Sequence, residues 1–148
     1  TGKTHLACAI LKRWIAIGRA NKLDPAFYNP TYRTLAWFYS VPELIKDIKA
    51  DMDYKKGPKA IERAMGFKAV VLDDLGSELS TEWAIATLEM ILARRVNWQF
   101  PTVVTSNKTL DEIQVFDPRM RSRLGSLEII TLVGDDRRDK SKGGSNGS

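Results

Sequence analysis

Gly2, Lys3 and Thr4, at the start of the sequence, are residue types that bind phosphate. They match the end of the phosphate-binding loop G-x-x-x-x-G-K-[ST], in which backbone amides surround the phosphates, the lysine reaches the outer phosphates and the hydroxyl holds Mg²⁺. Apolar residues at helical spacing follow, and a helix N-terminus offers free amides to an anion. Lys3 and Thr4 are therefore candidates for a nucleotide site, which the tripeptide alone does not establish. An ordinary surface tripeptide before a helix is the alternative.

The acidic pair Asp73-Asp74 is the second chemical feature, and it follows the apolar run 70–72. Such a run is typical of a parallel strand that is buried on both faces. Ligands of open α/β sheets bind at the carboxyl ends of the strands. There Asp73 could hold Mg²⁺ through water, and Asp74 could orient an attacking water. Two solvated turn carboxylates are the alternative, but the phosphate-binding tripeptide upstream favours a nucleotide site.

Polar residues 105–107 end the next apolar run in the same way. The amide of Asn107 could hold the attacking water or the outermost phosphate at the same edge of the sheet. A simple capping turn would give the same sequence, and the residues alone favour that interpretation.

Arginines gather in the predicted helix 117–124. Arg119 and Arg123 are four residues apart and share a face, whereas Arg121 points elsewhere. Two guanidinium groups on one face could supply an arginine finger to the nucleotide of a neighbouring subunit. A solvated basic face or a phosphate-backbone contact is equally compatible with the spacing. Arg137, near the end of the chain, could reach bound phosphates or belong to a charged tail.

Helices and strands alternate along the chain. Apolar spacing and capping residues predict helices over 4–19, 40–52, 60–65, 80–96, 109–115 and 117–124. Apolar runs predict strands over 35–39, 68–73, 102–105 and 127–133. This alternation predicts an α/β fold, a parallel sheet with helices covering both faces. The composition turns polar from residue 134, and we expect a flexible tail over 139–148.

The 148 residues suffice for one domain or most of one, and 43% of them are apolar. The net charge of +5 is compatible with nucleic-acid binding but is common in cytosolic enzymes. A single cysteine, Cys8, excludes an intramolecular disulfide and a multi-cysteine zinc site. No apolar run is long enough to span a membrane. Four tryptophans could stack on bases, but three of them lie in predicted helices or strands with apolar neighbours, which favours core packing.

Taken in order, these segments resemble the AAA+ ATPases of the bacterial helicase-loader group, which includes DnaC- and DnaI-type loaders and the IstB transposition helpers. The matching segments are 1–6 (end of Walker A), 71–78 (Walker B), 105–107 (sensor 1) and 119–124 (the R-x-x-S-R-L arginine-finger box). The resemblance covers residues 1–138, with a looser match to sensor 2 at 134–137, and leaves 139–148 as a tail. It implies a P-loop NTPase core that is truncated at its N-terminus, inside Walker A.

The resemblance also implies a role for each matching residue. It assigns the phosphates to Gly2, Lys3 and Thr4, Mg²⁺ to Thr4 and Asp73, the catalytic-base position to Asp74, sensor 1 to Asn107, the arginine finger to Arg123 with Arg119 as second choice, and sensor 2 to Arg137. Many AAA+ proteins have Glu where this chain has Asp74, so we expect slow or partner-stimulated hydrolysis.

The implied cofactors are ATP and Mg²⁺. The implied partners are a DnaB-type replicative helicase, single-stranded DNA and further copies of the chain across the ATP interface, in the cytoplasm and without a membrane. One alternative is an IstB-like transposition helper, which would bind duplex DNA and a transposase. The other is a nucleotide-gated binding module with negligible hydrolysis, which the shorter carboxylate of Asp74 would suit.

Overall fold

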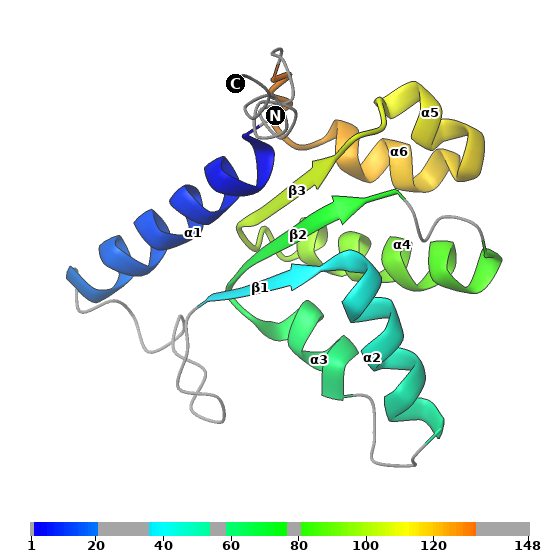
Figure 1. Ribbon diagram of the computed structural model, residues 1–148, viewed down its shortest axis with the longest axis horizontal. Coiled ribbons are helices and arrows are strands. Elements are labelled where there is room, and N and C mark those ends of the chain that lie inside the picture. Colours follow the sequence, from blue (N-terminus) through cyan, green and yellow to red (C-terminus); the bar gives the residue numbers. More distant parts are fainter. Residues whose placement is uncertain (1, 21–35, 54–58, 77–80, 133–148) are drawn as a thin grey trace, which may run out of the picture.

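The computed structural model describes residues 2–20, 36–53, 59–76 and 81–132. Three strands, β1 (Ala36–Ser40), β2 (Ala69–Leu75) and β3 (Thr102–Ser106), form one sheet in the order β1-β2-β3. Both strand pairs are parallel, and all three arrows point the same way in Figure 1. The parallel α/β sheet expected from the alternation of elements is therefore confirmed.

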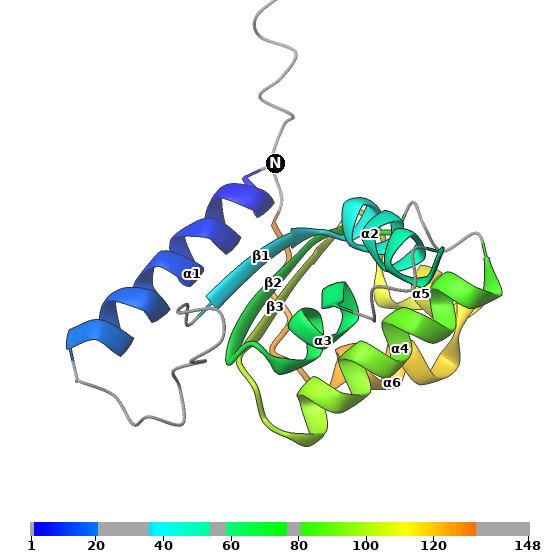
Figure 2. The same ribbon diagram turned by 90° about the horizontal axis from the view of Figure 1, so that it is seen from below.

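Helices cover the two faces of this sheet. The described helices are α1 (Lys3–Ala20), α2 (Val41–Asp53), α3 (Lys59–Gly66), α4 (Glu82–Asn97), α5 (Leu110–Phe116) and α6 (Pro118–Gly125). Figure 2 shows α1 on one side of the sheet and α2, α3, α4 and α6 on the other. The central strand is consequently covered on both faces, as its uninterrupted apolar run predicts.

The main core lies between β2 and the helices of the second face. Val70 and Leu72 of β2 are buried and belong to the same apolar cluster as Leu44 of α2 and Leu88 of α4. Full burial of a side chain of this size contributes about 1.5–3 kcal/mol. Trp37 and Trp83 pack against this cluster, as expected, whereas the exposed fraction of Trp98 is 50%. Trp98 lies outside the predicted helices and strands, on whose apolar neighbours the expectation of core packing rests.

Side chains at helix starts fix where the helices on the second face begin. Thr109 and Glu112 form the predicted capping box of α5, and Asp117 caps α6 with Pro118 at its first position. For α4 the N-cap is Thr81, whose hydroxyl accepts from the Ala84 N–H at 3.3 Å. The predicted cap, Ser80, lies outside the described residues; both residues carry a capping hydroxyl, so the sequence alone does not separate them.

The strand predicted over 127–133 is not formed in the described residues 127–132. Its apolar run suggested a buried strand, yet the exposed fractions of Ile129 and Ile130 are 58% and 61%. A strand requires a neighbour for its backbone hydrogen bonds, and this segment does not pair with β1, β2 or β3. Hydrophobicity alone was therefore a misleading signal at this position.

Candidate functional site

The first turn of α1 meets the acidic end of β2. The Thr4 hydroxyl donates to the Asp73 carboxylate, with 3.1 and 3.0 Å between its oxygen and the two carboxylate oxygens. These residues are 69 positions apart in the sequence. Asp73 is 8% exposed, because it lies within the central strand. The two residues predicted to share a magnesium ion are thus in direct contact.

Thr105 of β3 completes the surroundings of this carboxylate. Its hydroxyl donates to Asp73 Oδ1 at 2.6 Å and accepts from the backbone N–H of Asp74 at 2.9 Å. One side chain therefore positions both members of the acidic pair. Sequence analysis missed this residue, because it considered the 105–107 segment only for the amide at its end. The signal that could have found it is a hydroxyl on the strand beside an acidic strand end.

Asp74 projects from the sheet because the pairing of β2 with β3 is irregular at this point. The register shifts between Leu72 and Leu75, and the backbone φ of Asp74 is 64°. Asp adopts this left-handed conformation more readily than most residues, because its short side chain interacts locally. Asp74 is exposed, and the Asn107 amide donates to its Oδ1 at 3.3 Å. The bulge thus turns one carboxylate inward and the next outward.

The N-terminus of α1 has the groups that an anion requires. The Leu6 N–H donates to the Gly2 carbonyl at 2.9 Å, so the first helical turn is formed and the amides before Leu6 have no intrahelical acceptor. The first turn contains no acidic side chain, and it carries Lys3. This helix end is therefore suited to phosphate, beside a carboxylate and a hydroxyl that are suited to a cation.

The residues at this edge fit Mg²⁺ but do not form a complete cage for it. Hydroxyl and carboxylate oxygens, which Thr4 and Asp73 supply, are the hard ligands that Mg²⁺ prefers. No group of three or more His, Cys, Asp or Glu side chains in the described ranges could hold a metal ion. This fits an ion that is bound by one or two protein groups together with substrate phosphates.

The arginines of α6 have partners away from the acidic edge. Arg119 Nη2 pairs with Asp117 Oδ2 at 3.0 Å, and this contact raises the pKa of Arg119 and lowers that of Asp117. Arg123 Nε lies 3.7 Å from Glu89 Oε1 of α4, and Glu89 also acts on Arg119 through its charge. The two arginines therefore share a face, as their spacing predicts.

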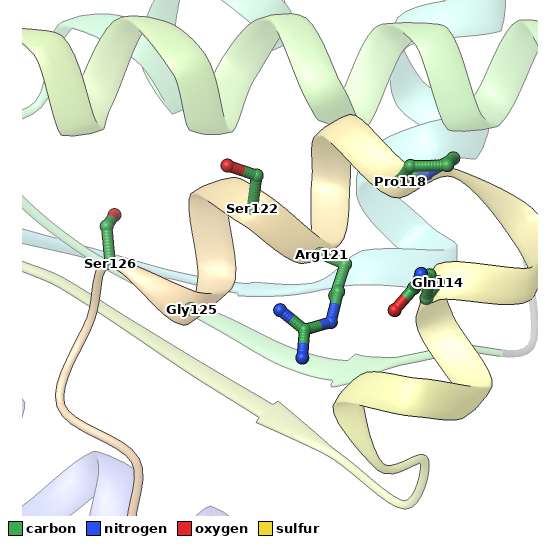
Figure 3. A pocket seen from close by; sticks show the side chains of 6 residues that line it. All are labelled: Gln114, Pro118, Arg121, Ser122, Gly125 and Ser126. Carbon is green, nitrogen blue, oxygen red and sulfur yellow. The ribbon is translucent and has the colours of Figure 1, made fainter.

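Arg121 lies on a different face of α6. It lines an open surface pocket of about 560 Å³ between α5 and α6, together with Gln114, Pro118, Ser122, Gly125 and Ser126. Figure 3 shows its guanidinium reaching into this space beside Gln114. Thr4, Asp73, Asp74 and Asn107 do not line this pocket, so it is separate from the acidic edge.

Arg137, the predicted sensor 2 residue, lies outside the described residues, as does the predicted tail 139–148. None of the helices in the described part of the chain has the length and hydrophobicity needed to cross a membrane.

The fold and the residues at the carboxyl edge of the sheet together define a class of protein. A parallel α/β sheet with a helix N-terminus, a hydroxyl and an acidic strand end at its carboxyl edge is the arrangement of a P-loop NTPase.

Comparison with solved structures agrees with this class. The chain is similar to the crystal structure of the DnaC helicase loader, with 26% sequence identity and a TM-score of 0.61. The similarity covers 84% of this chain and 67% of that one. No protein-family model and no curated protein matches the sequence. The chain therefore has a DnaC-like P-loop NTPase fold.

Proposed function

We propose that this chain is the ATP-binding and ATP-hydrolysing AAA+ core of a DNA replication helicase loader, which acts in the cytoplasm on a DnaB-type ring helicase and single-stranded DNA. The observation that carries the proposal is the contact between the Thr4 hydroxyl and the Asp73 carboxylate. It joins a phosphate-binding helix end to an acidic strand end in a DnaC-like fold.

Each residue at the edge has a distinct part in binding. Lys3 and the free amides of the first turn of α1 would hold the outer phosphates, while Thr4 and Asp73 would hold Mg²⁺. Mg²⁺ held there would supply positive charge to the phosphoryl group that is transferred. Thr105 keeps the Asp73 carboxylate oriented through its 2.6 Å hydrogen bond.

Hydrolysis depends on the outward carboxylate. Asp74 is exposed beside the acidic edge, where it accepts a hydrogen bond from Asn107 and can orient an attacking water. Its side chain is one methylene shorter than that of Glu, so turnover is slow until a partner brings the groups closer. Asn107 limits the orientations of Asp74 and senses the outermost phosphate.

Arg123 is the better candidate for a finger that reaches the ATP of a neighbouring copy. Arg119 is held at 3.0 Å by Asp117, which also caps α6 through the N–H groups of Arg119 and Met120. Arg123 contacts Glu89 only at 3.7 Å, so it is released at lower cost. The chain would then self-associate through the ATP interface, as an arginine finger in trans requires.

Two substitutions in the full-length protein test this assignment. Lys3→Ala should abolish ATP binding, because it removes the charge that neutralises the outer phosphates. Arg123→Ala should preserve ATP binding and remove hydrolysis that is stimulated by single-stranded DNA. Arg121→Ala, on the other face of the same helix, is the matched control and should retain stimulated turnover. Unchanged turnover in Arg123→Ala would refute the finger assignment.

A nucleotide-gated module with negligible hydrolysis is the second candidate, and the short Asp74 side chain favours it. Phosphate release from the wild-type protein, measured with and without single-stranded DNA, separates the two functions. Stimulated release excludes the gated module. Absence of release, together with ATP binding that is lost in Lys3→Ala, establishes it.

A transposition helper would use the same core. Pull-down of the full-length protein with a ring helicase and with a transposase, in the presence of single-stranded or duplex DNA, distinguishes it from a loader. Capture of the transposase on duplex DNA alone would overturn the loader assignment.

A further inference from the structure

The amino end of the sheet, opposite the acidic edge, carries an unusual surface. Trp98 and Phe100 lie in the turn between α4 and β3, and Lys68 directly precedes β2. The seven residues of β2 separate the two ends by roughly 20 Å. This aromatic surface, defined as Lys68, Arg94, Trp98 and Phe100, is therefore distinct from the candidate nucleotide site.

The Trp98 ring of this surface is exposed, and the half-buried Phe100 ring fixes its orientation. Trp98 is 50% exposed, and its ring meets that of Phe100 in an edge arrangement, with centroids 5.4 Å apart and an interplanar angle of 78°. A half-exposed indole presents a flat apolar area to solvent. Such an area is suited to stacking against another flat ring.

Cations surround these rings. The Arg94 guanidinium carbon lies 4.0 Å from the centroid of the Trp98 ring, and Lys68 Nζ lies 4.6 Å from that of Phe100. Residues 63–72, which lead into β2 and form its first half, and residues 90–103, which run from the second half of α4 to the start of β3, contain no Asp or Glu. Rings and positive charges are therefore combined in segments that contribute no carboxylate.

The turn that carries the rings is held firmly. Gln99 has a φ of 54°, which reverses the chain between the two aromatic residues. Beneath them, the fully buried Arg95 donates to the carbonyls of Ala64, Phe67 and Pro101 at 2.8–2.9 Å. Burial lowers the pKa of Arg95 to about 10, so it remains charged at neutral pH. The surface is preorganised, and a fixed positive charge lies under it.

We propose that the aromatic surface binds single-stranded nucleic acid, with a base stacked on Trp98 and neighbouring phosphates on Arg94 and Lys68. Proteins that bind single strands without sequence preference combine positive charge with exposed aromatic rings in this way. The choice of DNA over RNA rests on the proposed function. The proposal that this surface binds a single strand does not depend on that function.

Binding of a fluorescent oligo(dT) to the full-length protein, followed by anisotropy, tests this site. Trp98→Ala should weaken binding about tenfold, and Trp98→Phe should restore most of the affinity, because stacking tolerates any flat ring. An unchanged far-UV spectrum and melting temperature establish that Trp98→Ala is folded. Equal affinities of the wild-type and Trp98→Ala proteins would overturn the proposal, as would an equal loss in Trp98→Phe, because stacking on a flat ring would then not account for the binding.

Salt dependence supplies a second test, which does not involve the aromatic residues. Lys68→Gln should lower the slope of log affinity against log salt concentration by about 0.7, the value for one phosphate contact on a single strand. Lys46→Gln removes an equal charge from the exposed surface of α2 and should leave the slope unchanged. Identical slopes in the two variants would contradict the site.

The same preparations separate this inference from the proposed function. Binding of oligo(dT) that depends on Trp98, in a protein that does not bind ATP, refutes the nucleotide assignment alone. ATP binding that depends on Lys3, with oligo(dT) binding indifferent to Trp98, refutes the aromatic surface alone. Comparable affinities for oligo(dT) and oligo(U) support the surface, because stacking does not read the 2′-hydroxyl.

Discussion

The two ends of this sheet hold their buried charges differently. At the carboxyl end, Asp73 is surrounded by the hydroxyls of Thr4 and Thr105. At the amino end, Arg95 donates to backbone carbonyls and to the hydroxyl of Thr102. The first charge has side-chain partners that can rotate, and the second has partners that are mostly fixed by the backbone.

This difference indicates what each end is built for. Hydroxyl groups can give up a hydrogen bond to a carboxylate and become ligands of an arriving cation, so Asp73 can exchange partners without unfolding the sheet. Backbone carbonyls cannot rotate away, so Arg95 joins the end of α3 to the starts of β2 and β3 permanently. We therefore expect substitution to affect ligand binding at Asp73 and stability at Arg95.

Arg95→Met gives the largest expected effect. Met fills a similar volume but leaves several buried carbonyls without donors, and each unsatisfied group costs about 1–3 kcal/mol. The free energy of unfolding should fall by about 3–5 kcal/mol in denaturant titrations. Arg94→Met, next in the helix and exposed, should lose no more than about 1 kcal/mol. Similar losses in both variants would contradict the fixed role of Arg95.

Asp73→Asn is the corresponding test at the other end. Asn keeps an acceptor for Thr105 but removes the charge that attracts Mg²⁺, so the affinity for Mg²⁺-ATP should fall about a hundredfold, or about 2.7 kcal/mol. Stability should change by less than about 1 kcal/mol. Calorimetric titration and thermal melting measure the two quantities. Asp74→Asn is the matched control: it should retain binding and lose turnover.

Thr105→Val sharpens the comparison within the carboxyl end. Valine matches the shape of threonine but cannot donate to Asp73 or accept from the Asp74 N–H. We expect the Mg²⁺ concentration that gives half-maximal ATP hydrolysis to rise several-fold. The free energy of unfolding should fall by about 1 kcal/mol. Thr105→Ser should restore the magnesium dependence. A stability loss without a magnesium shift would show that Thr105 is only structural.

A contact could be predicted from the sequence where both of its residues belong to recognisable motifs. Thr4 and Asp73 were expected at one edge, because a glycine-lysine-threonine tripeptide and an acidic strand end both occur at the ligand edge of α/β sheets. Thr105 was missed because its role depends on contacts with the neighbouring strand β2. The residues around Thr105 in the sequence do not reveal these contacts. Arg95 was missed because a charged residue in an amphipathic helix ordinarily faces water.

The error at 127–133 has a physical origin. The expectation of a strand took hydrophobicity to indicate burial, although burial requires a partner surface in the folded chain. The exposed Ile129 and Ile130 lack enough of that cover among the described residues. Local sequence therefore gave the type of most elements, but it did not indicate which apolar groups the fold leaves exposed.

Asp117 offers the smallest test, at a charged pair between the buried carboxylate that caps α6 and the exposed guanidinium of Arg119. A hydrogen bond from Arg119 lowers the pKa of the Asp117 carboxyl in the folded protein. The resulting stabilisation is complete above the unfolded pKa of about 3.9 and is lost as pH falls through the lower, folded pKa. Asp117→Asn keeps a good N-cap but removes the charge, so it should cost a few tenths of a kcal/mol near pH 7 and nothing at the acid end.

Urea titrations of the Asn variant and the wild type at a series of pH values measure this difference. Asp117→Ala, which also removes the cap, should cost about 1 kcal/mol near pH 7 and retain part of that cost in acid, since a protonated carboxyl can still accept a hydrogen bond. A penalty for Asp117→Asn that did not change with pH would mean that shape, not charge, holds this pair. The pair would then behave like the fixed contacts of Arg95 and not like the exchangeable contacts of Asp73.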